Sequence, residues 1–125
     1  MPHELFIYDE IGPSEWGLID GKLMAAALAD IPADAELTVR INSPGGDVFQ
    51  GLNIYELLRE RPGPTAVRVD ALAGSIASII ALAGNPILIA PTAYFAIHKP
   101  QTIAGGEAAS LRRAADLLDN VEDTA

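Results

Sequence analysis

The fold of this chain is decided by residues 37–58, which read LTVRINSPGGDVFQGLNIYELL. Residues 37–41 predict a β-strand, and the NSPGG segment that follows predicts a tight turn. From Asp47 to about Arg61, apolar side chains recur at helical spacing, which predicts an amphipathic helix. A strand, a glycine turn and a helix in this order indicate a protein of the α/β class.

The sequence on both sides of this stretch predicts further strands and helices. Strands are expected over residues 4–8, 65–69, 87–89 and 94–97, and helices over about 14–30, 71–83 and 108–121, with a loop over 100–106. Ser14 is a candidate N-cap of the first helix. The alternating order predicts a mainly parallel sheet with helices packed outside it, in one domain that spans the 125 residues.

One uncharged segment, residues 71–97, is long enough to cross a membrane. However, Asn85-Pro86 and Pro91 interrupt it, and both are breaker signals. The segment is therefore expected to form a buried helix and two short buried strands. No membrane partner is expected.

The composition excludes several classes of function. Eight basic against 17 acidic residues give a net charge of −9, which argues against a nucleic-acid partner. The absence of cysteine excludes a thiolate nucleophile and a zinc–thiolate site. Two histidines, His3 and His98, are too few for a histidine-rich metal site, and the many small residues leave little room for a large cofactor. The acidic N-terminus lacks the basic region of a secretory signal, so a cytoplasmic location is expected.

Three segments could carry chemistry, and each has an ordinary structural interpretation. Gly45 and Gly46 stand between a strand and a helix, where their amides could bind a developing oxyanion or could simply form a turn, with Asp47 as the N-cap of the helix. Ser75 begins a predicted helix, where it is either an N-cap or a nucleophile at a strand-to-helix turn. As a nucleophile it would place the amide of Ile76 beside the oxyanion. Ser78, one turn later, is a competing candidate.

His98 follows an apolar strand and enters a loop. A lone histidine there is either a structural hydrogen-bonding residue or a general base. Because His3 lies in the N-terminal segment, serine–histidine chemistry in this sequence would use His98.

Taken together, these segments resemble the proteolytic subunit of Clp protease (ClpP) and, more closely, the ClpP-like head-maturation proteases of phages and prophages. The matching blocks are INSPGGDVFQGLNIYELL (41–58), ALAGSIASIIALAG (71–84) and AIHKP (96–100). The resemblance implies a ClpP/crotonase-like spiral of β-β-α units with a C-terminal handle helix at about 100–121. It also implies a homo-oligomeric ring, a heptamer or stacked heptamers, that encloses the active sites.

The resemblance further implies a serine endopeptidase. Ser75 would be the nucleophile, His98 the general base, and the amides of Gly46 and Ile76 the oxyanion hole. An extended peptide would bind alongside Gly45, Asp47 and Val48. No metal and no cofactor are implied. Partners would be a peptide or protein substrate, with an ATPase unfoldase or capsid proteins as further candidates.

The family's third triad residue, an aspartate, lies well beyond the histidine, whereas this chain ends 27 residues after His98. The domain is therefore expected to be incomplete at its C-terminus. The chain alone is expected to be nearly inactive, since loss of the orienting acid costs roughly 10⁴ in turnover. Two alternatives stay open, a crotonase-type acyl-CoA enzyme and a non-catalytic ring-forming assembly module.

Overall fold

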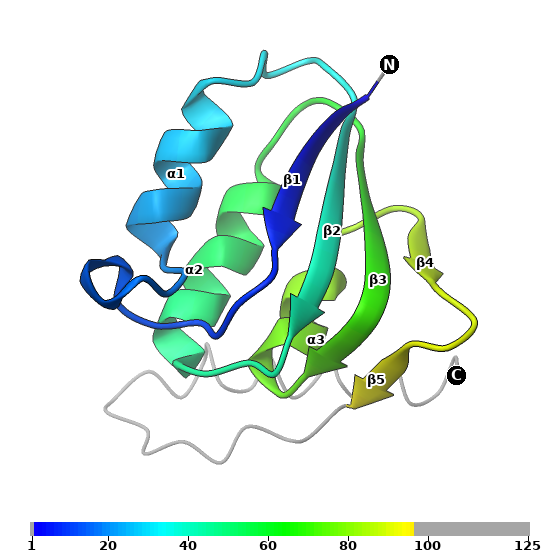
Figure 1. The fold of residues 1–125 in the computed structure, drawn as a ribbon. Coiled ribbons are helices and arrows are strands. Elements are labelled where there is room, and N and C mark those ends of the chain that lie inside the picture. The colour runs from blue at the N-terminus through cyan, green and yellow to red at the C-terminus, as the bar shows by residue number, and fades with distance from the viewer. Residues whose placement is uncertain (1, 97–125) are drawn as a thin grey trace, which may run out of the picture.

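The computed structural model describes residues 2–96 of the chain (Figure 1). It contains five strands, β1 (His3–Ile7), β2 (Leu37–Ser43), β3 (Thr65–Gly74), β4 (Ile87–Ile89) and β5 (Tyr94–Ala96). Its helices are a 3-10 turn η1 (Ser14–Trp16) and the α-helices α1 (Gly21–Ala29), α2 (Val48–Arg59) and α3 (Ile76–Ala81). The predicted loop at 100–106 and helix at 108–121 lie outside the described residues.

The strands form one sheet in the order β1-β2-β3-β4, and every strand pair is parallel. The central strand β3 pairs with β4 through Val67–Val69 and with β5 through Leu72–Gly74. β3 is long because it pairs first with β4 and then with β5 along the same side. This arrangement confirms the predicted parallel sheet.

The core lies between one face of this sheet and the helices. Alternate residues of β2 and β3 point into it, and Val39, Ile41, Val67 and Val69 are fully buried. In Figure 1, both helices lie behind the sheet, α3 behind β2 and β3, and α2 on the side of β1. The two helices approach closely at Gly51, where a Cβ would come within 2.2 Å of Ile76 Cγ1. Glycine at position 51 therefore allows α2 and α3 to pack closely.

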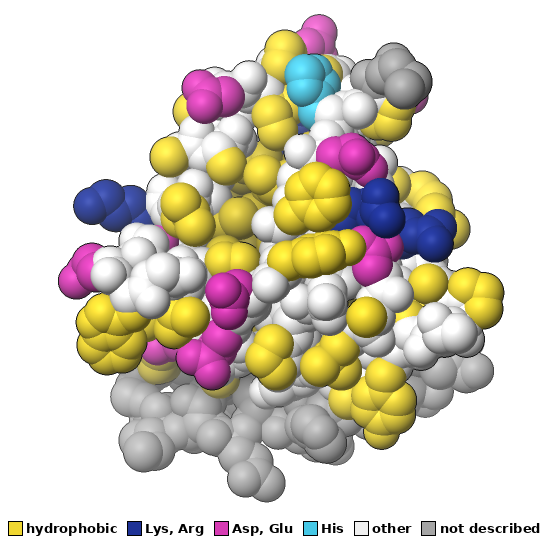
Figure 2. All heavy atoms as spheres, viewed as in Figure 1, with side chains coloured by type: hydrophobic (Ala, Val, Ile, Leu, Met, Phe, Trp, Pro, Cys, Tyr) yellow, Lys and Arg dark blue, Asp and Glu magenta, His cyan; other side chains and the backbone are white. Residues whose placement is uncertain are grey.

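The other face of the sheet is turned toward the viewer in Figures 1 and 2. Figure 2 shows apolar side chains interleaved with arginine and acidic side chains on this face. Phe6 and Tyr8 of the β1 segment are about half exposed there. Among residues 2–96, no helix is both long and apolar enough to cross a membrane.

The prediction of one continuous helix over residues 14–30 is wrong. Gly17 adopts a left-handed conformation (φ 81°) that ends η1, and α1 begins only at Gly21. Asp20, not Ser14, is the N-cap, since its carboxylate accepts hydrogen bonds from the amides of Leu23 and Ser14 at 2.9 and 2.8 Å. Asp20 thus accepts hydrogen bonds from both elements, and α1 begins directly after it.

Two predictions for residues 71–97 are also wrong. Residues 71–74 extend β3 instead of starting a helix, because they pair with β2 at Ala73 and with β5. The two short strands are not buried as expected, since the residues of β4 are 38–49% exposed and Tyr94 of β5 is 67% exposed. β4 lies at the end of the sheet in the part of the chain that the structure describes, which leaves its side chains uncovered there.

Candidate active site

Two strand-to-helix turns meet at the carboxyl ends of β2 and β3. One joins β2 to α2 through Pro44–Asp47, and the other joins β3 to α3 through Ser75. A Cβ placed on Gly45 would lie 2.8 Å from Ser75 Cβ and 3.2 Å from Ile76 N. Gly45 also has a φ of +100°, so both the close approach and the conformation favour glycine. The structure thus brings the predicted glycine loop against Ser75 and Ile76.

Ser75 has the backbone geometry of an exposed turn residue. Its φ of 52° and ψ of −126° make it the one non-glycine residue with positive φ among residues 2–96. It occupies the N-cap position of α3, yet its hydroxyl makes no capping hydrogen bond. The interpretation of Ser75 as an ordinary cap is therefore wrong. Strained positions of this kind cluster at functional sites.

The competing serine, Ser78, is placed differently. Its side chain is fully buried, and its hydroxyl donates a hydrogen bond of 2.5 Å to the Ser75 carbonyl. Ser43 is also fully buried, and its Oγ accepts a bond of 3.1 Å from the Gly45 amide. Of these three serines, only Ser75 is partly exposed.

The Gly45–Gly46 turn is held by Ile11, a residue that no sequence pattern singles out. The Ile11 amide donates to the Gly45 carbonyl at 2.8 Å, and the Asp47 amide donates to the Ile11 carbonyl at 2.9 Å. A Cβ on Gly46 would lie 2.1 Å from that carbonyl oxygen. Ile11 is fully buried and distant in sequence, so no local pattern around it signals the contact.

The amides of Gly46 and Ile76 have no acceptor within residues 2–96, which is also true of other amides in the first turns of α2 and α3. The bridge to Ile11 uses the Gly45 carbonyl and the Asp47 amide, so the Gly46 N–H between them makes no hydrogen bond in it. Ile76 is the first residue of α3, where a helix provides no internal acceptor for the amide. These are the two donors that the resemblance implies for an oxyanion hole.

The remaining predicted site residues lie at the start of α2. The Asp47 carboxylate accepts a hydrogen bond of 2.9 Å from the Gln50 amide, so it caps this helix as the sequence suggested. Val48, the first helical residue, is half-buried, and Gly46 beside it is exposed. Gly45, the third residue expected to bind the peptide, is buried, so an extended ligand along this turn would meet Gly46 and the first turn of α2 instead.

His98 lies outside the described residues. The strand that leads to it ends at the site, since the Ser75 amide donates a hydrogen bond of 3.2 Å to the carbonyl of Ala96. His98 is two residues farther along the chain. His3 is exposed on β1. Within residues 2–96, no group of three or more histidine and acidic side chains is arranged to hold a metal ion.

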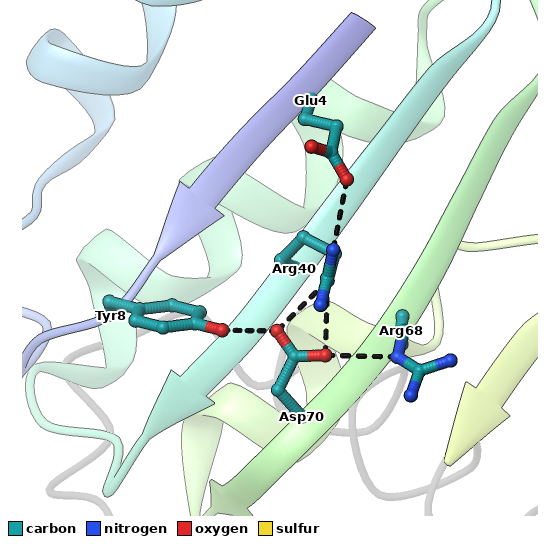
Figure 3. A network of polar contacts seen from close by, with 5 residues as sticks. All are labelled: Glu4, Tyr8, Arg40, Arg68 and Asp70. Atoms are coloured by element: carbon teal, nitrogen blue, oxygen red, sulfur yellow. Dashed lines mark hydrogen bonds and ion pairs between the residues drawn. The ribbon is translucent and has the colours of Figure 1, made fainter. Parts of the chain in front are cut away.

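A polar network crosses the sheet face opposite the helices (Figure 3). Asp70 of β3 accepts hydrogen bonds from Arg40, Arg68 and Tyr8, and Arg40 also pairs with Glu4 at 2.9 Å. Burial alone would raise the pKa of the Asp70 carboxyl, but the hydrogen bonds from Tyr8 and the arginines hold it below its usual value. The Asp70 contact in turn raises the pKa of the Tyr8 hydroxyl.

Comparison with known proteins identifies the family. The Clp protease family model matches residues 4–124. The chain belongs to the Clp protease family. It is 28% identical to the ATP-dependent Clp protease proteolytic subunit 1 of Leifsonia xyli subsp. xyli, over 91% of this chain and 58% of that protein. It is 28% identical to the proteolytic subunit 2 of Thermobifida fusca, over 91% of this chain and 56% of that protein.

The structure of a ClpP1 N165D mutant from Listeria monocytogenes has the same fold. It matches with a TM-score of 0.61 and 23% identity, over 95% of this chain and 67% of that one. This chain thus has the expected ClpP/crotonase-like fold and belongs to a family of peptidases. It spans less than three fifths of the length of the two curated relatives.

Proposed function

We propose that this Clp protease chain carries the catalytic part of a serine endopeptidase, with Ser75 as nucleophile and His98 as general base. The observation that carries the proposal is the conformation of Ser75. A positive φ, no capping bond and partial exposure leave its hydroxyl available at the sharp turn between β3 and α3. A serine placed in this way has no structural task that alanine or glycine would not perform as well.

The proposed reaction is acyl transfer. The Ser75 Oγ attacks a peptide carbonyl while His98 takes its proton, and the carbonyl oxygen becomes a tetrahedral oxyanion. The amides of Gly46 and Ile76, which lack acceptors within residues 2–96, stabilise that charge. His98 then protonates the leaving amine, and water releases the acyl group from Ser75. The hydrogen bond from Ser75 to Ala96 supports the role of His98, because it brings the preceding strand to the nucleophile.

The substrate is proposed to be an extended peptide that binds along Gly46, Asp47 and Val48, where the turn is exposed or half-buried. By the resemblance, the protein would assemble into a homo-oligomeric ring and act in the cytoplasm, in Clp-type proteolysis or phage capsid maturation. An ATPase unfoldase or a capsid protein would then deliver or be the substrate. The resemblance assigns no triad acid to these 125 residues, so slow turnover is expected from them alone.

A fluorophosphonate probe tests the proposal without requiring turnover. The probe should phosphonylate Ser75, located by peptide mass spectrometry, and Ser75→Ala should remove the label. Ser14→Ala is the matched control, since Ser14 lies in η1 and makes no contact with the turn at Ser75. Label at Ser43 or Ser78, or undiminished label in Ser75→Ala, would overturn the assignment of the nucleophile.

The base is tested by the pH dependence of the same labelling. The rate should rise with pH as the imidazole loses its proton, because only neutral histidine accepts the serine proton. His98→Ala should abolish this rise, whereas His3→Ala should leave it in place, since His3 is exposed on β1. A pH profile that survives His98→Ala would exclude His98 as the base.

A further inference from the structure

The two proposed oxyanion donors share a structural feature at the other end of their peptide units. A peptide unit is planar and trans, so its C=O and N–H point in opposite directions. The Gly46 N–H belongs to the same unit as the Gly45 C=O, and the Ile76 N–H to the same unit as the Ser75 C=O. Whatever binds these two carbonyl oxygens also orients the two N–H groups.

Both carbonyl oxygens are bound. The Ile11 amide donates to the Gly45 carbonyl at 2.8 Å. The Ser75 carbonyl receives two donors from one residue, the Ser78 amide at 3.0 Å and the Ser78 hydroxyl at 2.5 Å. A carbonyl oxygen only accepts, so the Ser78 hydroxyl must donate its proton there.

We propose that Ser78 is a positioning residue of the oxyanion hole, which holds and polarises the Ser75–Ile76 peptide through its hydroxyl. The proposal rests on the proposed function of Ser75. A hydrogen bond to a peptide carbonyl draws electron density toward the oxygen and makes the N–H of the same unit a stronger donor. It also fixes the plane of a peptide whose first residue has an unfavourable positive φ. Ser78 thus acts on the reaction through the Ile76 amide, without touching the substrate.

The surroundings of Ser78 favour this role over that of a helix residue that satisfies its own hydroxyl. Such hydroxyls commonly bond the carbonyl three or four residues earlier. Here, however, the acceptor is the strained Ser75, and the Ser78 side chain is fully buried, so water cannot replace the bond. Alanine at this position would be accommodated, since the Ser78 amide would still satisfy the Ser75 carbonyl.

Labelling kinetics test the proposal in the 125-residue chain. Ser78→Ala should slow phosphonylation of Ser75 by roughly tenfold, less than the 10²–10³ that loss of an entire oxyanion donor costs. Ser78→Cys, with a weak S–H donor, should fall between serine and alanine. The affinity for a peptide boronate, whose adduct places an oxygen near the Ile76 amide, should fall in parallel. The affinity for the corresponding peptide amide should stay constant, which a general distortion of the site would not allow.

An NMR measurement keeps the proposal testable apart from activity. In Ser78→Ala, the ¹⁵N and ¹H shifts of the Ile76 amide should move upfield as its peptide loses polarisation. The Gly46 amide is the internal control, because Ile11 holds its peptide and should keep its shift. Unchanged Ile76 shifts, or labelling at the wild-type rate in Ser78→Ala, would overturn the role of Ser78 and leave Ser75 in place. Absence of label in the wild type would instead count against the proposed function.

Discussion

The two strand-to-helix turns of the candidate site solve the same geometric problem in different ways. The turn after β2 places its positive φ values on glycines, Gly45 and Gly46, and ends in Asp47, whose carboxylate caps α2. The turn after β3 places its positive φ on Ser75 and leaves α3 without a side-chain cap. The first turn thus has glycine at its positive φ values and a capped helix. The second has neither, and both departures occur at Ser75.

This difference indicates what each turn is built to do. The glycine turn is relaxed, so it can hold an amide in one orientation at little cost in free energy. The serine turn stores strain, which for a non-glycine residue in an unfavourable region is about 1–3 kcal/mol. Strain persists only where the surroundings determine the conformation, and here the bonds from Ser75 to Ala96 and from Ser78 to Ser75 do so.

The largest effect is expected where the relaxed turn is made to carry a side chain. In Gly46→Ala, the new Cβ would lie 2.1 Å from the Ile11 carbonyl oxygen at a φ of +144°, so the turn must move. We expect a loss of about 3 kcal/mol in the free energy of unfolding, measured by urea denaturation. Labelling of Ser75 by the fluorophosphonate should be lost as well, because the Gly46 amide shifts.

Gly17→Ala is the matched control for this substitution. Gly17 also has a positive φ, +81°, but a Cβ there would meet nothing within 4 Å. It should cost only the backbone term of about 1 kcal/mol and leave labelling unchanged. If the two variants were equally destabilised, contact with Ile11 would not be what constrains the glycine turn.

Much of this geometry followed from the sequence, because local signals coincided with tertiary structure. The strand, turn and helix over residues 37–58 are amphipathic and capped in place, and Asp47 is the predicted cap. The helix expected at 71–83 failed in its first four residues because alanine and glycine accept either conformation. Pairing with β2 and β5 then decides for a strand.

The site was predicted in part for the same reason. Ser75 and the glycines were visible as types of residue at turns, whereas their contact arises only when β2 and β3 pair in register. Ile11 could not be found, since its contribution is a backbone amide that any residue except proline would supply. Ser78 was visible only as a rival nucleophile, because a hydroxyl's partner depends on where the carbonyl before it points.

The next effect concerns the caps of the two helices. Asp47→Ala removes the acceptor of the Gln50 amide and should lower the free energy of unfolding by about 1 kcal/mol. Ser75→Ala removes no capping bond, so its unfolding free energy should stay within about 0.5 kcal/mol of the wild type. Urea denaturation of both variants checks the contrast. A loss in Ser75→Ala as large as that in Asp47→Ala would mean that Ser75 is a structural residue.

A smaller effect of opposite sign is expected when the strain itself is removed. Ser75→Gly relieves the positive φ, and this gain exceeds the entropy that glycine adds to the unfolded chain. The free energy of unfolding should therefore rise by about 0.5 kcal/mol, measured by urea denaturation at neutral pH. Ser78→Gly is the control and should lower the free energy of unfolding, since Ser78 lies within α3 at ordinary helical geometry. Equal losses in the two variants would show that Ser75 is unstrained.

The smallest effect concerns the strands that lead into the two turns. Asp70 ties β3, which ends at the serine turn, to Arg40 of β2, which ends at the glycine turn. Because its folded pKa is held below the unfolded value of about 3.9, its ion pairs stabilise the fold above that pH, and the stabilisation is lost as pH falls through the lower folded pKa. Asp70→Asn should cost less than about 0.5 kcal/mol at neutral pH, since its arginine partners are partly exposed.

The pH dependence distinguishes this network from the other acids. Urea midpoints measured from pH 6 down to pH 2 should fall less steeply below about pH 4 in Asp70→Asn than in the wild type. Asp20→Asn is the comparison and should also flatten the acid slope, because the pKa of Asp20 is lowered too, first by the Leu23 amide and then by the Ser14 amide. If Asp70→Asn kept the full acid slope, the network would not couple the two strands through charge. The register of β2 and β3, and with it the contact of Gly45 with Ser75, would then rest on backbone pairing and the core.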